Sequence, residues 1–291
     1  FEELCGSDYI ALIHADGNGL GKAMQSLETQ KGWLNNEAHI ETFFQTMRVT
    51  LRRALQQAVT KLFAEKQSGE SRQGLQILML GGDDLLVACR APLALEFVKH
   101  LGQALIDIQQ GSNSLYPPLT IGAGIAIAKP KFPFHRLHDM AEELASSAKR
   151  LVRNMEPAVS VMDWAICSEA WYGDLKDVRK KANLLQYSID HTTETLALSA
   201  KPYCILTNDN TPHEGHNIRS LQEILEQKIS LENDNEYSTA RSQLRHLVRQ
   251  MRKGRRQADL AFKDLQISSP KTWQALKKEG FDKSLWEEVN K

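Results

Sequence analysis

The chain has 291 residues, of which 42% are hydrophobic and 25% are charged, and these values are ordinary for a globular protein. Lys plus Arg and Asp plus Glu number 36 each, so no overall excess of charge points to nucleic acid or membrane as a partner. No stretch approaches the roughly 18 consecutive apolar residues of a membrane-spanning helix. The chain opens without a signal-like apolar segment, so we expect a cytoplasmic protein that is cut from a longer polypeptide. Its four cysteines form no CxxC pair, which argues against a zinc knuckle or a disulfide framework.

Apolar patterns in the first part of the chain alternate between those of strands and those of helices. The expected order is a strand at 9–15, a helix at 37–65, a hairpin of strands at 75–80 and 85–89, a helix at 92–110, a strand at 119–128, a helix at 134–155 and a strand at 158–164. This order predicts an α+β fold of the ferredoxin-like palm type, with helices on one face of a sheet.

The character of the sequence changes after residue 166. Residues 166–216 are mixed, with a short strand expected near "YCILTN", and almost everything from 218 onward has a helical pattern. We therefore expect two domains, a palm at 1–166 and, at 167–291, a mixed linker region followed by a C-terminal α-helical domain.

One basic segment, residues 241–256, stands out in the helical part. It carries seven Lys or Arg residues and no acid, and apolar residues interleave with them at helical spacing. One interpretation is a solvated face over a packed stripe. The other is a docking surface for RNA or a protein partner.

Acidic residues follow apolar strands at two separate places. Asp16 directly follows the first strand and precedes glycines, while Asp83 and Asp84 occupy the "GGDD" turn between two apolar runs. Because the first strand and the hairpin are neighbours in a palm sheet, we expect these carboxylates to converge. Oxygen ligands without Cys or His favour Mg²⁺ or Mn²⁺. The predicted metal site comprises Asp16, Gly17, Asp83 and Asp84.

A phosphate-binding site is predicted beside these carboxylates. Backbone N–H groups of Gly17, Asn18, Gly19, Leu20 and Gly21, at the start of a helix, could cradle a triphosphate. This loop is neither a Walker motif nor a dinucleotide-binding motif. In the helix "AEELASSAKRLVRN", Lys149 and Arg153 lie four residues apart on one face and would neutralise phosphate oxygens. Mg²⁺ itself takes many of its ligands from water and substrate phosphates, which also implies a phosphate-bearing ligand.

Each motif also has a plainer interpretation. The GGDD stretch could be a decorated hairpin turn, Asp16 could be a helix N-cap, and Lys149 with Arg153 could form a solvated helix face. The "HD" pair at His138 and Asp139 resembles part of a phosphohydrolase site. That site needs further ligands from separate helices, which are not patterned here, so we interpret the pair as an ordinary helical turn.

Taken together, "IHADGNGLGK", "GGDD" and the helix with "AK" followed by "RN" resemble the nucleotide-cyclase palm. GGDEF diguanylate cyclases and the large polymerase-like subunit of type III CRISPR effectors share that palm. The sequence GGDD followed by Leu85 is similar to the CRISPR form, whereas diguanylate cyclases carry Glu-Phe there. The stretches "SVMDWAICSEA" and "KPY" resemble the second palm and C-terminal helical domain of that subunit. An N-terminal HD nuclease, a first palm and a zinc finger are lacking, so we expect a fragment or a reduced stand-alone relative.

The resemblance implies a metal-dependent nucleotidyltransferase that joins and cyclises ATP into cyclic oligoadenylate, a second messenger in antiviral defence. Two metal ions would bind Asp16, Asp83 and Asp84, and the glycine loop with Lys149 would hold the triphosphate. CRISPR effector subunits and RNA are the implied partners. Two alternatives stay open. One is a GGDEF-type synthase that makes cyclic dinucleotides from GTP as a dimer of palms, and the other is a catalytically silent palm that serves as a nucleotide-binding or RNA-assembly module.

Overall fold

A computed structural model describes most of the chain. The described residues are 4, 8–28, 37–64, 74–110, 118–153, 159–167, 177, 184–189, 192–197, 201–206, 220–223, 225 and 237–278. The chain divides into two compact units, the first comprising Phe1–Leu175 and Ala200–Ile224 and the second Lys176–Ser199 and Leu225–Lys291. The domain boundary expected at residue 166 stays a prediction. In the structure, a short strand well beyond it, β8 (Tyr203–Cys204), returns to the sheet of the first unit.

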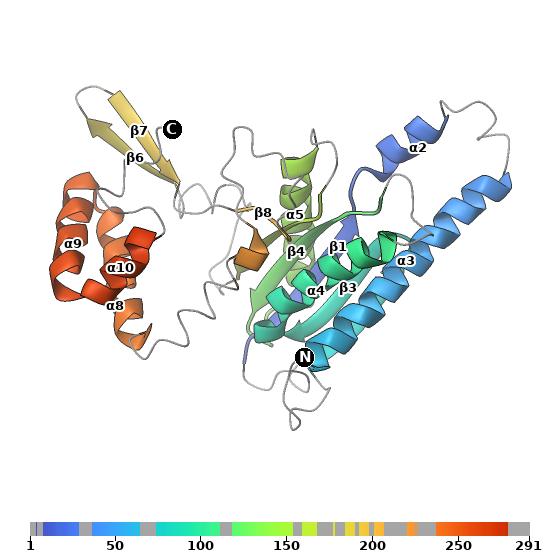
Figure 1. Ribbon diagram of the computed structural model, residues 1–291, viewed down its shortest axis with the longest axis horizontal. Coiled ribbons are helices and arrows are strands. Elements are labelled where there is room, and N and C mark those ends of the chain that lie inside the picture. Colours follow the sequence, from blue (N-terminus) through green and yellow to red (C-terminus); the bar gives the residue numbers. More distant parts are fainter. Residues whose placement is uncertain are drawn as a thin grey trace. The chain divides into compact units, whose positions relative to one another are not determined.

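A six-stranded sheet forms the centre of the first unit, in the order β2-β3-β1-β4-β5-β8 (Figure 1). Its longer strands are β1 (Ile10–Gly17), β2 (Leu75–Gly81), β3 (Asp84–Arg90), β4 (Ile121–Ala128) and β5 (Val161–Ile166). The central strand β1 is antiparallel to both β3 and β4, whereas β4 and β5 are parallel. The predicted α+β palm is confirmed, since β1 to β4 with their connecting helices have the ferredoxin-like order.

Helices cover both faces of this sheet. They are α3 (Glu37–Ala64), α4 (Ala91–Gln109) and α5 (Phe134–Val152), whereas the short α2 (Leu20–Glu28) follows the end of β1. Ile10 and Leu12 of β1 pack with Leu137 and Leu144 of α5 in one buried cluster. Alternation along the strand turns the buried Ile13 to the opposite face, where α4 contacts the sheet (Figure 1). The expectation of helices on one face only was therefore wrong, because α5 covers the second face.

The helix α5 lies directly on strand β4 at Gly124. A Cβ atom at this position would collide with the backbone carbonyl oxygen of Ala141 and the backbone nitrogen of Ala145. Only glycine permits so close an approach of helix and strand backbones. This contact fixes where α5 lies along the sheet, and hence where its polar side chains reach.

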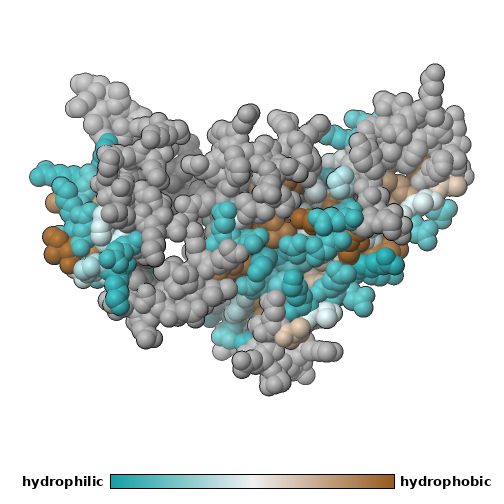
Figure 2. Space-filling view, viewed as in Figure 1, coloured by the Kyte–Doolittle hydropathy of each residue, from teal (hydrophilic) through white to brown (hydrophobic). Residues whose placement is uncertain are grey.

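On the other face, α3 buries one side of its long helix. Its buried residues recur at helical spacing, and the positions between them are mostly polar and exposed; the buried ones are Met47, Thr50, Leu51, Ala54, Leu55, Ala58 and Leu62. Hydrophilic residues accordingly dominate the described helical surface on this side of the palm (Figure 2). Among the described residues, no helix combines the length and the apolar character needed to cross a membrane.

The second unit contains a hairpin and a group of helices. Strands β6 (Leu184–Ile189) and β7 (Thr192–Ala197) pair antiparallel, and the helices are α8 (Tyr237–Met251), α9 (Arg255–Ser268) and α10 (Pro270–Lys278). Phe262 of α9 packs edge-on against Trp273 of α10, with ring centroids 5.0 Å apart. The helices confirm the predicted C-terminal helical domain. The hairpin was not predicted, because polar residues interrupt the apolar pattern of both strands.

Candidate functional site

The carboxylates Asp16 and Asp84 lie at adjoining strand ends. In the antiparallel pair of β1 and β3, Ala15 lies opposite Leu85, so Asp16, which follows Ala15, and Asp84, which precedes Leu85, come side by side. At the same end of β3, Gly81 of β2 pairs with Asp84 and leaves Gly82 and Asp83 as a two-residue turn. Gly82 has a φ of 63°, in the left-handed region that glycine adopts readily. The glycine therefore makes the turn, which presents Asp83 at its tip.

Asp83 reaches the same place from the turn. Its Oδ2 atom would lie 2.8 Å from a Cβ placed on Gly17, so a side chain at position 17 would exclude the carboxylate. Burial raises the pKa of Asp83 above its usual value, the negative charges of Asp16 and Asp84 raise it further, and a backbone hydrogen bond opposes them. The structure thus gathers three carboxylates, Asp16, Asp83 and Asp84, that repel one another.

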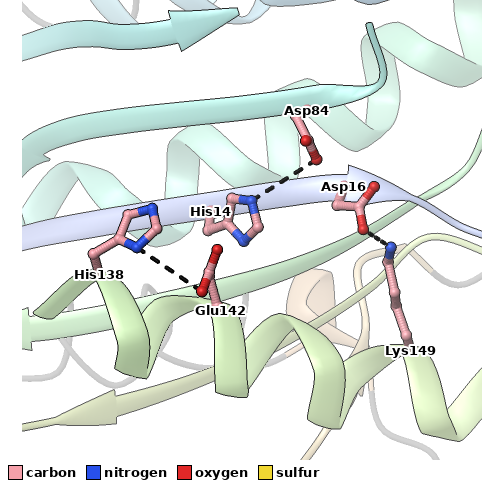
Figure 3. A network of polar contacts seen from close by, with 6 residues as sticks. All are labelled: His14, Asp16, Asp84, His138, Glu142 and Lys149. Atoms are coloured by element: carbon pink, nitrogen blue, oxygen red, sulfur yellow. Dashed lines mark hydrogen bonds and ion pairs between the residues drawn. The ribbon is translucent and has the colours of Figure 1, made fainter. Parts of the chain in front are cut away.

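Two positive or polarisable groups moderate this repulsion (Figure 3). Lys149, in the last turn of α5, forms an ion pair with Asp16. His14 lies two residues before Asp16 on β1, and its Nε2 atom is 3.8 Å from Oδ1 of Asp84. The pKa of Asp84 is raised, first by burial and then by Asp16, while His14 and Lys149 act to lower it.

The glycine loop that follows β1 is tied to the sheet through Asn18. Its backbone nitrogen donates to the Thr120 carbonyl oxygen at 2.8 Å, and its Nδ2 donates to Thr120 Oγ1 at 3.2 Å and to the Val159 carbonyl oxygen at 3.1 Å. The amide nitrogen of Asn18 therefore binds protein atoms and anchors the loop. Gly19 has a φ of 68° and is exposed, and α2 begins at Leu20 with Gly21 exposed after it.

The two basic residues predicted for the phosphate site lie in different surroundings. Lys149 faces the carboxylates, whereas Arg153 follows the end of α5 and its side chain is exposed. The backbone carbonyl of Arg153 accepts a hydrogen bond of 2.7 Å from Lys22 Nζ, which connects α2 to the end of α5. Lys22 was not among the predicted site residues, although it closes the "GNGLGK" motif.

The sequence analysis did not single out His14 or Glu142, and it interpreted His138 as part of an ordinary helical turn. The rings of His14 and His138 have centroids 6.0 Å apart, and His138 Nδ1 is 3.9 Å from Glu142 Oε2 (Figure 3). Alternation along β1 was the available signal, because it puts His14 on the same face as Asp16. Ligand atoms of His138, Asp139 and Glu142 lie within 4.8 Å of one another on α5. Exposed acids often lie this close without any metal, so the cluster adds nothing to the site.

The donor set fits a hard divalent cation. Asp16, Asp83 and Asp84 offer carboxylate oxygens alone, and burial first, then the negative charge of the neighbouring carboxylates, raises the pKa values of the latter two. Mg²⁺ and Mn²⁺ prefer such oxygen ligands. Lys149 adds a positive charge beside Asp16. The three carboxylates and this lysine can therefore bind a metal ion together with an anionic ligand such as a polyphosphate.

A comparison with protein families identifies the domain. The model of the Cas10/Cmr2 second palm domain matches residues 9–155, which include both acidic motifs and all of α5. The chain belongs to the Cas10/Cmr2 family. The predicted resemblance to the large subunit of type III CRISPR effectors is thereby confirmed. A search of curated proteins found no match.

Solved structures of Csm1 and of Csm1-Csm4 cassettes match part of the chain. The apo Csm1-Csm4 cassette is 16% identical, with a TM-score of 0.40 over 53% of this chain and 21% of that chain. The cassette in complex with one ATP is 16% identical, with a TM-score of 0.41 and the same two coverages of 53% and 21%. Csm1 from T. onnurineus is 16% identical, with a TM-score of 0.38 over 52% of this chain and 21% of that chain. The chain therefore matches only about a fifth of the length of these proteins.

Proposed function

We propose that the palm of this chain is a metal-dependent nucleotidyltransferase, which joins and cyclises ATP into cyclic oligoadenylate with release of pyrophosphate. The observation that supports it best is the convergence of Asp16, Asp83 and Asp84 opposite Lys149. Carboxylates that share one place, with a cation facing them, suit a site that binds metal ions and a polyphosphate together. The choice of ATP and of a cyclic product comes from the family, not from the geometry of the carboxylates.

In this proposal the carboxylates of Asp16, Asp83 and Asp84 hold two Mg²⁺ or Mn²⁺ ions beside Gly17. When bound, the ions supply positive charge that favours ionisation of an attacking 3′-hydroxyl and stabilises the departing pyrophosphate. Lys149 neutralises phosphate oxygens from the side of α5. The backbone N–H groups of Gly19, Leu20 and Gly21, at the start of α2, orient the triphosphate, and the exposed Arg153, which follows the end of α5, is our proposed contact for its far end.

Asn18 and His14 support these groups in different ways. Asn18 holds the glycine loop against the sheet through its bonds to Thr120 and Val159, so the loop N–H groups keep one orientation. His14, whose Nε2 lies 3.8 Å from Asp84 Oδ1, is our candidate for orienting that carboxylate. Both residues act by orienting their neighbours, which is how a site avoids reorganisation at the moment of reaction.

Effector subunits and RNA are the partners that we propose. Family membership favours a CRISPR effector complex, and the basic segment 241–256 is our candidate surface for RNA or a neighbouring subunit. Arg245, Arg249 and Arg256 are exposed there, on α8 and α9. Exposed arginines suit phosphate contacts, which depend on charge more than on shape.

The deciding experiment is product analysis by mass spectrometry after incubation of the purified chain with Mn²⁺ and either ATP or GTP. We expect cyclic oligoadenylate from ATP. If the chain alone is inactive, the incubation is repeated with effector subunits and target RNA. A clear preference for GTP would support a cyclic dinucleotide synthase instead, and ATP binding without turnover in the assembled complex would support a silent palm.

A further inference from the structure

Lys149 reaches the carboxylates by an unusual route across strand β4. Its side chain passes over Gly122, where a Cβ atom would collide with Lys149 Cγ and lie 3.4 Å from Lys149 Cδ. The buried Gly122 therefore leaves open the space that the aliphatic part of the lysine fills. The missing side chain at Gly122 of β4 therefore provides the path that the Lys149 side chain takes.

The pairing register of β1 and β4 shows why the missing side chain at Gly122 matters for Asp16. Gly122 is the direct cross-strand partner of Asp16 in the antiparallel pair of β1 and β4. Directly opposite residues in such a pair project to the same face, with their Cβ atoms about 5 Å apart. A side chain at position 122 would accordingly stand between Lys149 and Asp16, on the face where their ion pair forms.

We propose that Gly122 is a positioning residue, which admits Lys149 as the resident counter-cation of the three carboxylates. A metal ion that binds Asp16 must displace the ammonium group of Lys149, which then becomes available to phosphate oxygens. The lysine thus exchanges one anionic partner for another when metal and nucleotide enter. This inference rests on the proposed metal and nucleotide function of the same site.

Opposite changes in two binding affinities distinguish this role from a structural one. If Lys149 competes with the metal, its loss strengthens metal binding and weakens polyphosphate binding. If Lys149 or Gly122 merely maintained the fold, their substitution would weaken both. The side chains of Lys149 and Asp16 are 28% and 32% exposed, so solvent screens the ion pair and the change in metal affinity will be moderate.

The experiment compares wild type with Lys149→Ala, Gly122→Ala and the double variant. Electron paramagnetic resonance measures Mn²⁺ binding, and calorimetry measures the binding of inorganic tripolyphosphate in saturating Mn²⁺. For each single variant we expect Mn²⁺ affinity to rise about threefold to fivefold and tripolyphosphate affinity to fall about tenfold. Lys61→Ala, which removes an exposed lysine from α3, is the charge-matched control and should change neither affinity.

The double variant tests whether Gly122 acts through Lys149. In the Lys149→Ala background the remaining close neighbour of a Cβ at 122 is Asn18 Oδ1 at 3.0 Å, so the effect of Gly122→Ala on both affinities should largely vanish. Equal effects in both backgrounds would overturn the inference. So would a fall in Mn²⁺ affinity, or an unchanged one, in Lys149→Ala.

Folding is checked by circular dichroism for every variant. If Gly122→Ala unfolds alone but folds in the Lys149→Ala background, the lysine side chain is the cause of the clash and the inference is supported. Unfolding in both backgrounds would overturn it. Both readouts are equilibrium binding, so a chain without cyclase activity still tests Gly122. Failure of wild type to bind Mn²⁺ would overturn the proposed metal site and this inference together.

Discussion

Like charges gather in two regions of this protein, and they are arranged in different ways. Asp16, Asp83 and Asp84 come from two distant segments and meet where burial and mutual repulsion raise the pKa values of Asp83 and Asp84. Arg245 and Arg249 lie one turn apart on a single helix and are exposed. Water relieves the repulsion between the arginines more fully than the repulsion between the partly buried carboxylates. Gathering the carboxylates therefore costs the folded protein stability, which is typical of a functional site. The exposed basic face carries no such cost, so it needs no functional explanation.

The largest expected effect comes from removing two of the three carboxylates of the acidic site. The double substitution Asp83→Ala with Asp84→Ala should lower product formation from ATP to below about a thousandth of the wild-type rate, because the metal ions lose most of their ligands. The rate is measured by mass spectrometry of the cyclic product. The control is Asp107→Ala with Asp264→Ala, which removes two exposed acids elsewhere. Unchanged turnover in the Asp83 and Asp84 variant would end the proposed function.

A second large effect concerns the packing that positions α5 over the acidic site. Gly124→Ala should reduce the free energy of unfolding of the palm by about 3 kcal/mol, since a Cβ atom would overlap the backbone of Ala141. Urea denaturation measures the change. Gly81→Ala is the matched control, because no atom lies within 4 Å of a Cβ placed there. Similar stability of the two variants would show that α5 can shift along β4, and that its register is not what places Lys149.

A moderate effect should reveal the stability cost of the carboxylates directly. The pKa of Asp83 is raised above 3.8 in the folded state, so the folded protein holds this proton to higher pH than the unfolded chain. The contribution of Asp83 to stability therefore falls as the pH rises from about 3.8 through the raised value. Asp83→Asn should stabilise the metal-free protein at pH 7 by up to about 1 kcal/mol, because solvent screens a partly exposed carboxylate.

The same substitution should have little effect below about pH 3.8, where Asp83 is protonated in both the folded and the unfolded state. Thermal unfolding at pH 3.5 and pH 7 in the presence of a chelator measures the difference. An equal change in stability at the two pH values would mean that charge repulsion is not the cause. Destabilisation at pH 7 would contradict the prediction outright.

The smallest expected effect comes from neutralising arginines of the basic segment 241–256. Substituting Arg245, Arg249 and Arg252 by Gln should leave ATP binding and stability nearly unchanged. It should weaken RNA binding and reduce its dependence on salt, because fewer counterions are released. Fluorescence anisotropy with RNA at two salt concentrations measures both. The control replaces three exposed arginines of the palm helix α3, namely Arg48, Arg52 and Arg53. Superimposed curves for wild type and the α8 variant would identify an ordinary solvated face.

Several parts of the fold were predictable because they depend on local properties of the chain. Apolar runs on either side of GGDD predict two strands, and a glycine that can adopt a positive φ predicts the turn between them, as Gly82 shows. The order of strands and helices in turn predicts the palm, in which Asp16 and the hairpin are neighbours. The hairpin β6–β7 escaped prediction because its strands lack a clear apolar alternation.

The surroundings of the carboxylates were less accessible from the sequence. Spacing alone put Lys149 and Arg153 on one helix face, but α5 ends between them, so only Lys149 faces Asp16. Asn18 was predicted to offer its backbone N–H group to a phosphate, yet that group donates to the Thr120 carbonyl oxygen, and its Nδ2 bonds to Thr120 and Val159, which are far away in the chain. These outcomes depend on where helices end and which loops meet, and neither is a property of a short segment.

The sequence by itself determined which residues could carry the chemistry, because residue type, glycine content and strand period are all local. Only the tertiary structure decided how those residues meet. The pairing of Asp16 with Gly122 exists only in the register that joins β1 to β4, and the route of Lys149 exists only because α5 packs against β4 at Gly124. Register and close packing are set by many weak contacts across the whole sheet, so no single motif encodes them.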